Sequence, residues 1–230
     1  MTRYALADAI GCLAGGLIVS CQAYPGEPMR DPRTMAQIAQ AAVDGGAVAV
    51  RLQGLDDIRV AAHLPVPVVG LWKDGNAGVY ITPSLEHAVA VADAGADVVA
   101  LDGTRRRRRD GRTLVETIRA LRVERDVLVM ADCGSLDDAR AAEDAGVDLI
   151  GTTLSGYTGE RARTDGPDLE LIAEVARRCD APVIGEGRVR TPDDAAAVLA
   201  AGALAVCVGT AITHPASITA RFARALARGA

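Results

Sequence analysis

The stretch 94-AGADVVALDGT-104 contains the unit from which the rest of the fold can be predicted. It begins with Ala-Gly, and glycine suits the left-handed residue that closes a helix. A short apolar run, Val98–Leu101, follows and ends at the polar Asp102. The same order recurs in 145-AGVDLIGTTLS-155 and 201-AGALAVCVGTA-211, and more loosely from Asp44. A repeated helix stop, buried strand and polar loop is what a parallel sheet covered by helices requires.

Candidate strands of this kind recur along the whole chain, with alanine-rich helical segments between them. Eight can be counted: Gly16–Gln22, Val48–Gln53, Val66–Lys73, Val98–Asp102, Val127–Asp132, Leu149–Leu154, Pro182–Glu186 and Ala205–Thr210. Eight β/α units in 230 residues predict a single-domain (β/α)8 TIM barrel, with an extra N-terminal helical segment over about residues 1–14. A doubly wound sheet is the alternative, but it more often uses about five to seven strands. The apolar VYITPS, residues 79–84, is expected in the third βα loop.

Composition narrows the class of protein. The formal net charge of −5 argues against a general affinity for nucleic acid, and the run Arg105–Arg109 is interpreted as a solvated loop whose first members could reach an anionic substrate. No stretch of about 18 uncharged apolar residues occurs, so no membrane span is expected. The five cysteines form no CxxC pair, which indicates neither a zinc site nor a disulfide framework. We therefore expect a soluble, cytoplasmic protein without a metal.

Polar residues end nearly every candidate strand. A barrel builds its active site at the C-terminal ends of its strands, so these residues are the candidates for chemistry. They are Gln22, Arg51, Lys73, Asp102, Asp132, Thr152, Thr153, Glu186, Arg188, Gly209 and Thr210. One polar strand end means little, but a whole set of opposite charges at one mouth is expected to compensate itself, as buried charges must. His63, His87 and His214 share no spacing and are interpreted as structural or exposed residues.

The last two strands are each followed by glycine. These loops, 184-IGEGR-188 and 208-VGTAI-212, occupy the positions where a barrel usually holds phosphate with bare backbone N–H groups. Glycine permits close approach of the backbone to the anion. The pair of loops indicates a phosphorylated small molecule as ligand.

Several motifs, taken in order, resemble one family. They are GGLIVSCQA, EPM, AVAVR, GLWK, ITPSLEHA, AGADVVALDGT, VMADCGSLDDA, GVDLIGTTLSGYT, PDLELI, EGRVRTPDDA and AVCVGTAITHP. Together they resemble the N-acetylmannosamine-6-phosphate 2-epimerases of bacterial sialic-acid catabolism, from about Gly15 to Phe222. The resemblance implies interconversion of N-acetylmannosamine 6-phosphate and N-acetylglucosamine 6-phosphate without a metal or organic cofactor.

The resemblance also implies roles for individual residues. Lys73 and Glu186 match the family's catalytic lysine and glutamate, and Asp132 its catalytic aspartate. The residues matched to substrate contacts or placed with them at the mouth are Gln22, Arg51, Asp102, Thr153 and Tyr157. The residues expected to hold the phosphate are Gly187, Arg188, Gly209 and Thr210. A homodimer is expected from the family, with the alanine-rich C-terminal helix as a possible interface.

Proton transfer at C2 of the sugar needs two groups on opposite faces. The C2 proton is acidic enough only beside the C1 aldehyde of the open-chain form, and its enolate must be stabilised. Lys73 at the third strand and Glu186 at the seventh lie on roughly opposite sides of an eight-strand mouth. We expect them to exchange the proton, Asp132 to orient the lysine or the sugar hydroxyls, and Arg51 to stabilise negative charge. The alternatives are another phosphosugar isomerase or synthase on such a barrel, or a non-catalytic sugar-phosphate sensor.

Overall fold

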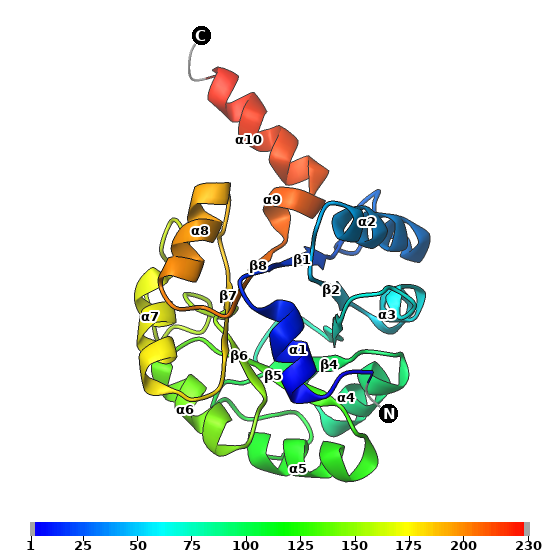
Figure 1. Cartoon of the computed structure of the whole chain (residues 1–230), viewed down its shortest axis with the longest axis vertical. Helices are drawn as coiled ribbons and strands as arrows, with labels where there is room; N and C mark the ends of the chain where they lie inside the picture. Colours follow the sequence, from blue (N-terminus) through cyan, green and yellow to red (C-terminus); the bar gives the residue numbers. More distant parts are fainter. Residues whose placement is uncertain (1–2, 228–230) are drawn as a thin grey trace.

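The eight apolar runs form eight parallel strands that pair in chain order and close into a barrel, with β1 against β8 (Figure 1). The computed structural model describes residues 3–227. The strands are β1 (Leu17–Cys21), β2 (Ala49–Gln53), β3 (Val68–Leu71), β4 (Val98–Asp102), β5 (Leu128–Asp132), β6 (Leu149–Gly151), β7 (Val183–Glu186) and β8 (Ala205–Val208). The predicted (β/α)8 barrel is therefore confirmed. Several strands are shorter than the candidate strands expected from the sequence.

Helices surround the barrel and alternate with its strands (Figure 1). They are α1 (Leu6–Leu13), α2 (Pro32–Asp44), α3 (Leu55–Ala61), α4 (Leu85–Asp93), α5 (Leu114–Glu124), α6 (Leu136–Asp144), α7 (Leu169–Arg178), α8 (Pro192–Ala200), α9 (Thr210–Thr213) and α10 (Pro215–Ala227). No helix within residues 3–227 is long and apolar enough to cross a membrane.

The barrel interior is filled by apolar side chains from all eight strands, and one layer of it takes a single side chain from each. This set is Ile18, Ala49, Val69, Val98, Leu128, Leu149, Ile184 and Ala205, and it packs together with Ala9 and Leu13 of α1. Helix α1 thus covers the N-terminal end of the barrel with its buried face. The segment expected to form an extra helix contains α1, while its residues 1 and 2 lie outside the described residues. Closing this end leaves the opposite end for a ligand.

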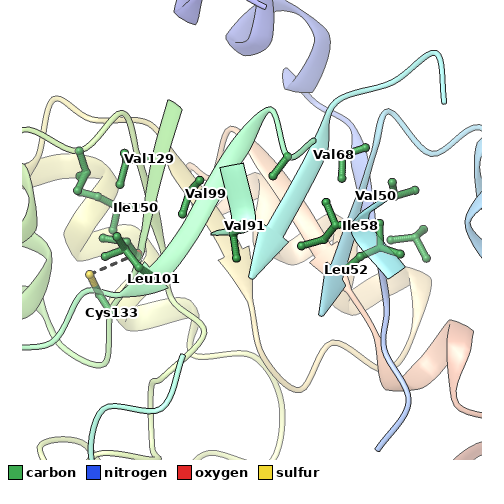
Figure 2. Packing of buried hydrophobic residues seen from close by; sticks show 14 of the residues in the cluster. Val50, Leu52, Ile58, Val68, Val91, Val99, Leu101, Val129, Cys133 and Ile150 are labelled. Atoms are coloured by element: carbon green, nitrogen blue, oxygen red, sulfur yellow. Dashed lines mark hydrogen bonds between the residues drawn. The ribbon is translucent and has the colours of Figure 1, made fainter. Parts of the chain in front are cut away.

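A second apolar layer lies between the strands and the outer helices (Figure 2). Alternate residues of each strand point outward, so Val50 and Leu52 of β2 pack with Ile58 of α3. Gly70 in β3 shows how close the helices come, because a Cβ there would lie 2.9 Å from Cδ1 of Ile58 in α3 and 3.0 Å from Cγ1 of Val91 in α4. Rigid packing of this kind holds the strand ends, and therefore the side chains at the mouth, in fixed positions.

Helix α10 differs from the other long helices in its environment. It extends away from the barrel (Figure 1), and none of its described residues is buried. Phe222 and Leu226 are 65% and 77% exposed. The large apolar side chains of this helix are therefore not covered by the rest of the described chain.

Candidate active site

The C-terminal ends of the strands open into one large cavity of about 790 Å³. Ten of the site residues expected from the sequence line it: Gln22, Arg51, Lys73, Thr153, Tyr157, Glu186, Gly187, Arg188, Gly209 and Thr210. Of the other expected residues, Asp102 and Asp132 are 0% exposed and Thr152 is 1% exposed, and none of the three is among the lining residues. The barrel therefore brings the expected residues to one mouth, in an inner lining and a layer behind it.

Arg51 joins the acidic residues at the base of the cavity. It comes from β2 and is 1% exposed. Its Nη2 donates to Asp132 Oδ2 at 2.6 Å, and its Nη1 donates to Glu186 Oε2. The hydroxyl of Thr153 accepts from Arg51 Nη1 at 3.2 Å and lies 2.6 Å from Asp132 Oδ1, to which it donates. Arg51 therefore fixes two carboxylates from opposite sides of its planar fork.

These ion pairs and the burial of the site shift the pKa values of its ionisable groups. Burial alone would lower the pKa of the Arg51 guanidinium, but the charges of Asp132 and Glu186 raise it above its usual value. Burial raises the pKa of the Glu186 carboxyl, and the positive charge of Arg51 opposes that rise. The thiol of Cys207 lies next to Glu186, and burial raises its pKa well above the ordinary range. Among these groups, Arg51 is the cation on which the ionised form of Glu186 depends.

Lys73 lies just beyond the end of β3, in a turn that folds back on itself. Asp74 N donates to Tyr80 O at 3.0 Å, and Thr82 N donates to Trp72 O at 2.8 Å. Ile81 O in turn accepts from Asp102 N of β4 at 3.0 Å, so the expected loop segment 79–84 is inserted beside the strand ends. This short ladder fixes the backbone of Lys73 from both sides.

The Lys73 amine faces the cavity with few partners. Lys73 is the only lysine in the sequence, whose other 24 basic residues are arginines. Its Nζ donates to Gln22 Oε1 at 2.7 Å and lies 5.6 Å from the ring centre of Tyr24. No carboxylate within residues 3–227 lies within 4.0 Å of it. Burial lowers the pKa of Lys73, and the charge of Arg51 adds to this effect while Glu186 and Asp132 oppose it.

The two glycine loops adopt the conformations that their glycines allow. Gly187 has a φ of 116°, and Arg188 follows with a φ of 59°, which is unusual for a residue with a side chain. Gly209 precedes α9, and a Cβ there would lie 3.2 Å from the Cβ of Ser20. The first N–H groups of α9 have no intrahelical acceptor, as in any first helical turn. The loops thus present backbone donors at the edge of the cavity.

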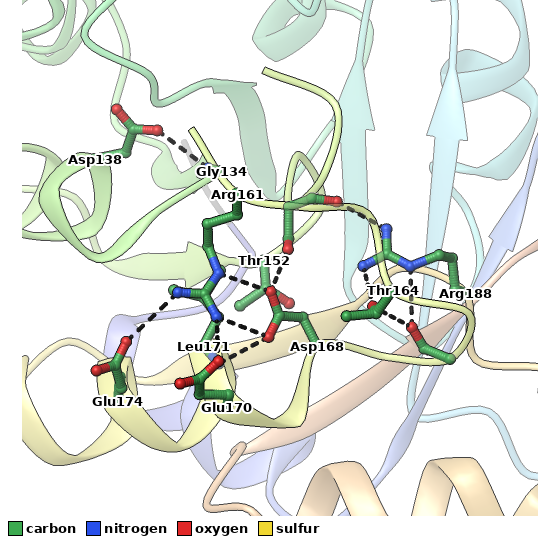
Figure 3. Close-up of polar contacts among 12 residues, drawn as sticks. Gly134, Asp138, Thr152, Arg161, Thr164, Asp168, Glu170, Leu171, Glu174 and Arg188 are labelled. Atoms are coloured by element: carbon green, nitrogen blue, oxygen red, sulfur yellow. Dashed lines mark hydrogen bonds and ion pairs between the residues drawn. The ribbon is translucent and has the colours of Figure 1, made fainter. Parts of the chain in front are cut away.

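The Arg188 side chain forms its hydrogen bonds with the loop between β6 and α7. It donates to Ser155 O at 2.7 Å, to Gly166 O at 3.0 Å and to Thr164 Oγ1 at 2.9 Å (Figure 3). Its guanidinium also lies 5.6 Å from the ring centre of Tyr157. Phosphate binding through Arg188, as expected from the sequence, would therefore use its backbone N–H rather than the guanidinium. The side chain holds the loop, residues 152–168, against the cavity.

The change Arg188→Lys is expected to loosen this loop, since one ammonium cannot reproduce three hydrogen bonds in a planar fork. We expect limited trypsin digestion to cut faster after Arg161 and Arg163, and KM for the substrate to rise several-fold, an effect of about 1 kcal/mol. Arg177→Lys on α7, an exposed position outside the cavity, is the matched control. Unchanged digestion of Arg188→Lys would show that the loop is held by other contacts.

The arginine run after β4 is solvated only in part: Arg105, Arg107 and Arg109 are exposed, as expected, whereas the other two arginines are not. Arg108 is 3% exposed and donates to Asp102 O at 2.8 Å and Thr82 O at 2.7 Å. Arg106 Nη2 donates to Asp102 Oδ2 at 2.6 Å, and Thr104 also bonds this carboxylate. The Asp102 side chain, expected to contact substrate, therefore faces its own loop in this structure. The carbonyls of Asp102 and Thr82 accept hydrogen bonds from Arg108. The sequence pattern does not reveal that these carbonyls need a side-chain donor.

Acidic side chains at the mouth are also the candidates for holding a metal ion. Asp132 and Glu186 already bind Arg51, and Asp102 already binds Arg106. No group of three or more His, Cys, Asp or Glu side chains that could hold a metal ion occurs in residues 3–227. In this chain these carboxylates serve as partners of arginines.

Several cavity residues were not expected from the sequence. Tyr24, Tyr80 and His214 line the cavity, and His214 Nε2 lies 2.5 Å from Glu27 Oε1. The interpretation of His214 as structural or exposed therefore missed its place beside the site. These residues lie in loops rather than at strand ends. The repeating sequence pattern predicts which residues lie at strand ends, but it does not predict the positions of loop residues. For Tyr24, the only available signal was its position as the third residue of the β1–α2 loop.

Comparisons with known proteins agree with this geometry. A family model described as "Putative N-acetylmannosamine-6-phosphate epimerase" matches residues 35–228. A relative from Cutibacterium acnes with the corresponding 2-epimerase name is 62% identical over 220 residues, covering 94% of this chain and 96% of the relative. A relative of the same name from Caldanaerobacter subterraneus is 47% identical over 219 residues, covering 94% and 92%.

Solved structures give the same result. The N-acetylmannosamine-6-phosphate 2-epimerase from Clostridium perfringens superimposes with a TM-score of 0.91 at 34% identity, covering 97% of both chains. A thiamine phosphate pyrophosphorylase from Pyrococcus furiosus has a TM-score of 0.61 at 19% identity over 89% of both chains, which shows a shared fold alone. The match over most of its length places this chain in the N-acetylmannosamine-6-phosphate epimerase family.

Proposed function

We propose that this protein interconverts N-acetylmannosamine 6-phosphate and N-acetylglucosamine 6-phosphate by moving the proton on C2. The observation that carries the proposal is the position of Lys73. Its amine faces a large cavity without an ion-pair partner among the described residues, while Glu186 is held at the base of the same cavity by Arg51. The family membership of the chain supplies the substrate class.

Lys73 and Glu186 are the two groups proposed to exchange the C2 proton. In the open-chain sugar, one group removes the proton from C2 and leaves an enolate, and the other returns a proton to the opposite face. A neutral amine and an ionised carboxylate can each act as the base, and their protonated forms can each act as the acid. The lowered pKa of Lys73 increases the fraction of neutral amine near neutral pH.

Arg51 and Asp132, at the base of the cavity, are proposed to assist this proton exchange without carrying the proton. Arg51 lines the cavity and carries a permanent positive charge, which stabilises negative charge developing on the enolate. Asp132 bonds Arg51 and Thr153 rather than Lys73, so we assign it the orientation of Arg51. This differs from the role expected from the sequence, in which Asp132 orients the lysine or the sugar hydroxyls.

The phosphate group is proposed to bind the two glycine loops. Gly187, and Gly209 and Thr210 at the start of α9, line the same cavity as Lys73. Backbone donors at a helix start favour an anion, and bare glycine allows the phosphate to approach. Gln22 is proposed to contact the reacting end of the sugar, and its hydrogen bond from Lys73 supports this.

The proposed function is tested by incubating the protein with N-acetylmannosamine 6-phosphate in deuterium oxide and following C2 by proton NMR. We expect the second epimer to appear and the C2 proton signal to disappear from both epimers. Conversion without deuterium incorporation would contradict proton exchange with solvent, and the absence of both would contradict the function. A sugar-phosphate sensor would bind the substrate with neither change.

We also infer that the protein acts as a homodimer in the cytoplasm. The exposed apolar residues Phe222 and Leu226 of α10 support a second copy as their cover. The five cysteines are free thiols, which suits a reducing compartment. Size-exclusion chromatography with light scattering is expected to give twice the 23.7 kDa chain mass, and a monomer mass would overturn the dimer.

A further inference from the structure

Five arginines line the outer part of the cavity and come from three separate elements. Arg163 lies in the loop between β6 and α7, Arg188 and Arg190 in the loop after β7, and Arg221 and Arg224 on α10. The acidic residue among the lining residues is Glu186, which is already bound to Arg51. The mouth of this cavity is therefore strongly positive in a chain with a formal net charge of −5.

None of the five arginines forms an ion pair with a carboxylate anywhere in residues 3–227. Some arginines elsewhere, such as Arg105, Arg109 and Arg161, each reach at least one carboxylate, and exposed arginines without an ion pair, such as Arg177 and Arg178, lie outside the cavity. Positive charges that gather in one cavity without acidic partners repel one another. Such an arrangement is expected where an anionic ligand supplies the missing charge.

Three of the five have guanidinium groups that are not used to build the site. Arg188 is bonded to the loop between β6 and α7, and Arg163 lies 5.1 Å from the ring centre of Tyr157. Arg190, Arg221 and Arg224 are exposed, and Arg221 makes one long contact of 3.5 Å to the Arg190 carbonyl. These three arginines, which we call the outer arginines, are free to meet a ligand that arrives from solvent.

Helix α10 separates its basic residues from its apolar ones. Ser217, Arg221 and Arg224 follow the i, i+4, i+7 spacing of one helix face, and all three line the cavity. Phe222 and Leu226 lie on a different face by the same periodicity. A second copy on the apolar face therefore leaves the arginine face of α10 directed at the cavity.

We propose that the outer arginines form a capture subsite for the phosphate group of the incoming substrate, outside the glycine loops that hold it during reaction. This inference rests on the proposed function for the identity of the substrate, a phosphate monoester with about two negative charges. Clefts lined by one sign of charge raise association rates by about 10- to 1000-fold, and the effect weakens with salt. Because the subsite lies beyond the reacting groups, it affects encounter and not the chemical step.

The double change Arg221→Gln/Arg224→Gln tests the capture subsite. In low-salt buffer we expect kcat/KM for N-acetylmannosamine 6-phosphate to fall about tenfold, while kcat at saturation stays within about twofold. The dependence of kcat/KM on ionic strength is expected to become shallower than in the wild type. The matched control is Arg177→Gln/Arg178→Gln, which removes two exposed charges from α7 outside the cavity. Light scattering on both variants verifies that the oligomeric state is unchanged.

Competitive inhibition by linear oligophosphates provides a second measurement, which reports binding to the free enzyme rather than the rate of the chemical step. The glycine loops and the outer arginines line the same cavity, so tripolyphosphate, which carries more phosphate groups and more charge, is expected to inhibit at least about tenfold more strongly than inorganic phosphate. This advantage should disappear in Arg221→Gln/Arg224→Gln and persist in the control variant. Equal inhibition by both anions, or an unchanged kcat/KM in the double variant at low salt, would overturn the subsite. A wild-type protein that fails to turn over the sugar phosphate would instead contradict the proposed function.

Discussion

Replacing Lys73 with methionine is expected to lower C2 proton exchange by about 10³-fold or more, near the upper part of the range for a positioned acid/base group. Methionine keeps an unbranched chain of similar length but has no amine to carry the proton. The measurement is deuterium incorporation at C2, followed by proton NMR with N-acetylmannosamine 6-phosphate. Binding of inorganic phosphate, measured by calorimetry, is expected to persist, because the glycine loops do not depend on the lysine.

The change Lys73→Arg distinguishes a proton carrier from a fixed positive charge. Arginine keeps the charge but stays protonated at all accessible pH values, so it cannot act as the base. If Lys73 carries the proton, Lys73→Arg should be as inactive as Lys73→Met. Activity retained by the arginine variant would show that only charge is required at this position. Since Lys73 is the only lysine in the sequence, no second lysine can substitute for it in either variant.

The barrel and its mouth could be predicted because they depend on local patterns. A helix stop followed by a short apolar run repeats along the chain, and parallel pairing in chain order then follows from the number of units. Strand ends consequently share one face, which is why Lys73, Arg51 and Glu186 were expected together. The period of two along each strand also fixes that these side chains point inward.

Contacts between loops could not be predicted, because no period governs them. The run Arg105–Arg109 looks uniform in sequence, yet Arg108 is buried on backbone carbonyls while Arg109 reaches Asp74. The fork of Arg51 between Asp132 and Glu186 depends on distances across the barrel, which strand numbering gives only as neighbours or opposites. Likewise, the spacing of Arg221 and Arg224 shows one helix face, but not that the cavity extends to it.

Replacing Arg51 with methionine is expected to lower the free energy of unfolding by about 3–5 kcal/mol near pH 7.5 and to abolish epimerisation. The cost arises because Asp132, at 0% side-chain exposure, and Glu186, at 14%, lose the cation that compensates both of them. Urea unfolding followed by circular dichroism measures the loss. Arg59→Met is the control, since Arg59 pairs with Asp56 at side-chain exposures of 56% and 74%, and such surface pairs contribute about 0–1 kcal/mol.

The pH dependence of Arg51→Met separates lost charge from lost packing. Burial raises the pKa of Glu186 in the folded protein, and Arg51 opposes this rise, so removing Arg51 raises that pKa further. A group with a raised folded pKa binds its proton more tightly in the folded state, so its contribution to stability is present at low pH and is lost as the pH rises through the folded pKa. The deficit of Arg51→Met relative to the wild type should therefore shrink toward about pH 5 and grow toward about pH 8. A deficit that stayed constant between these values would instead place the cost in the packing of the Arg51 side chain rather than in its charge.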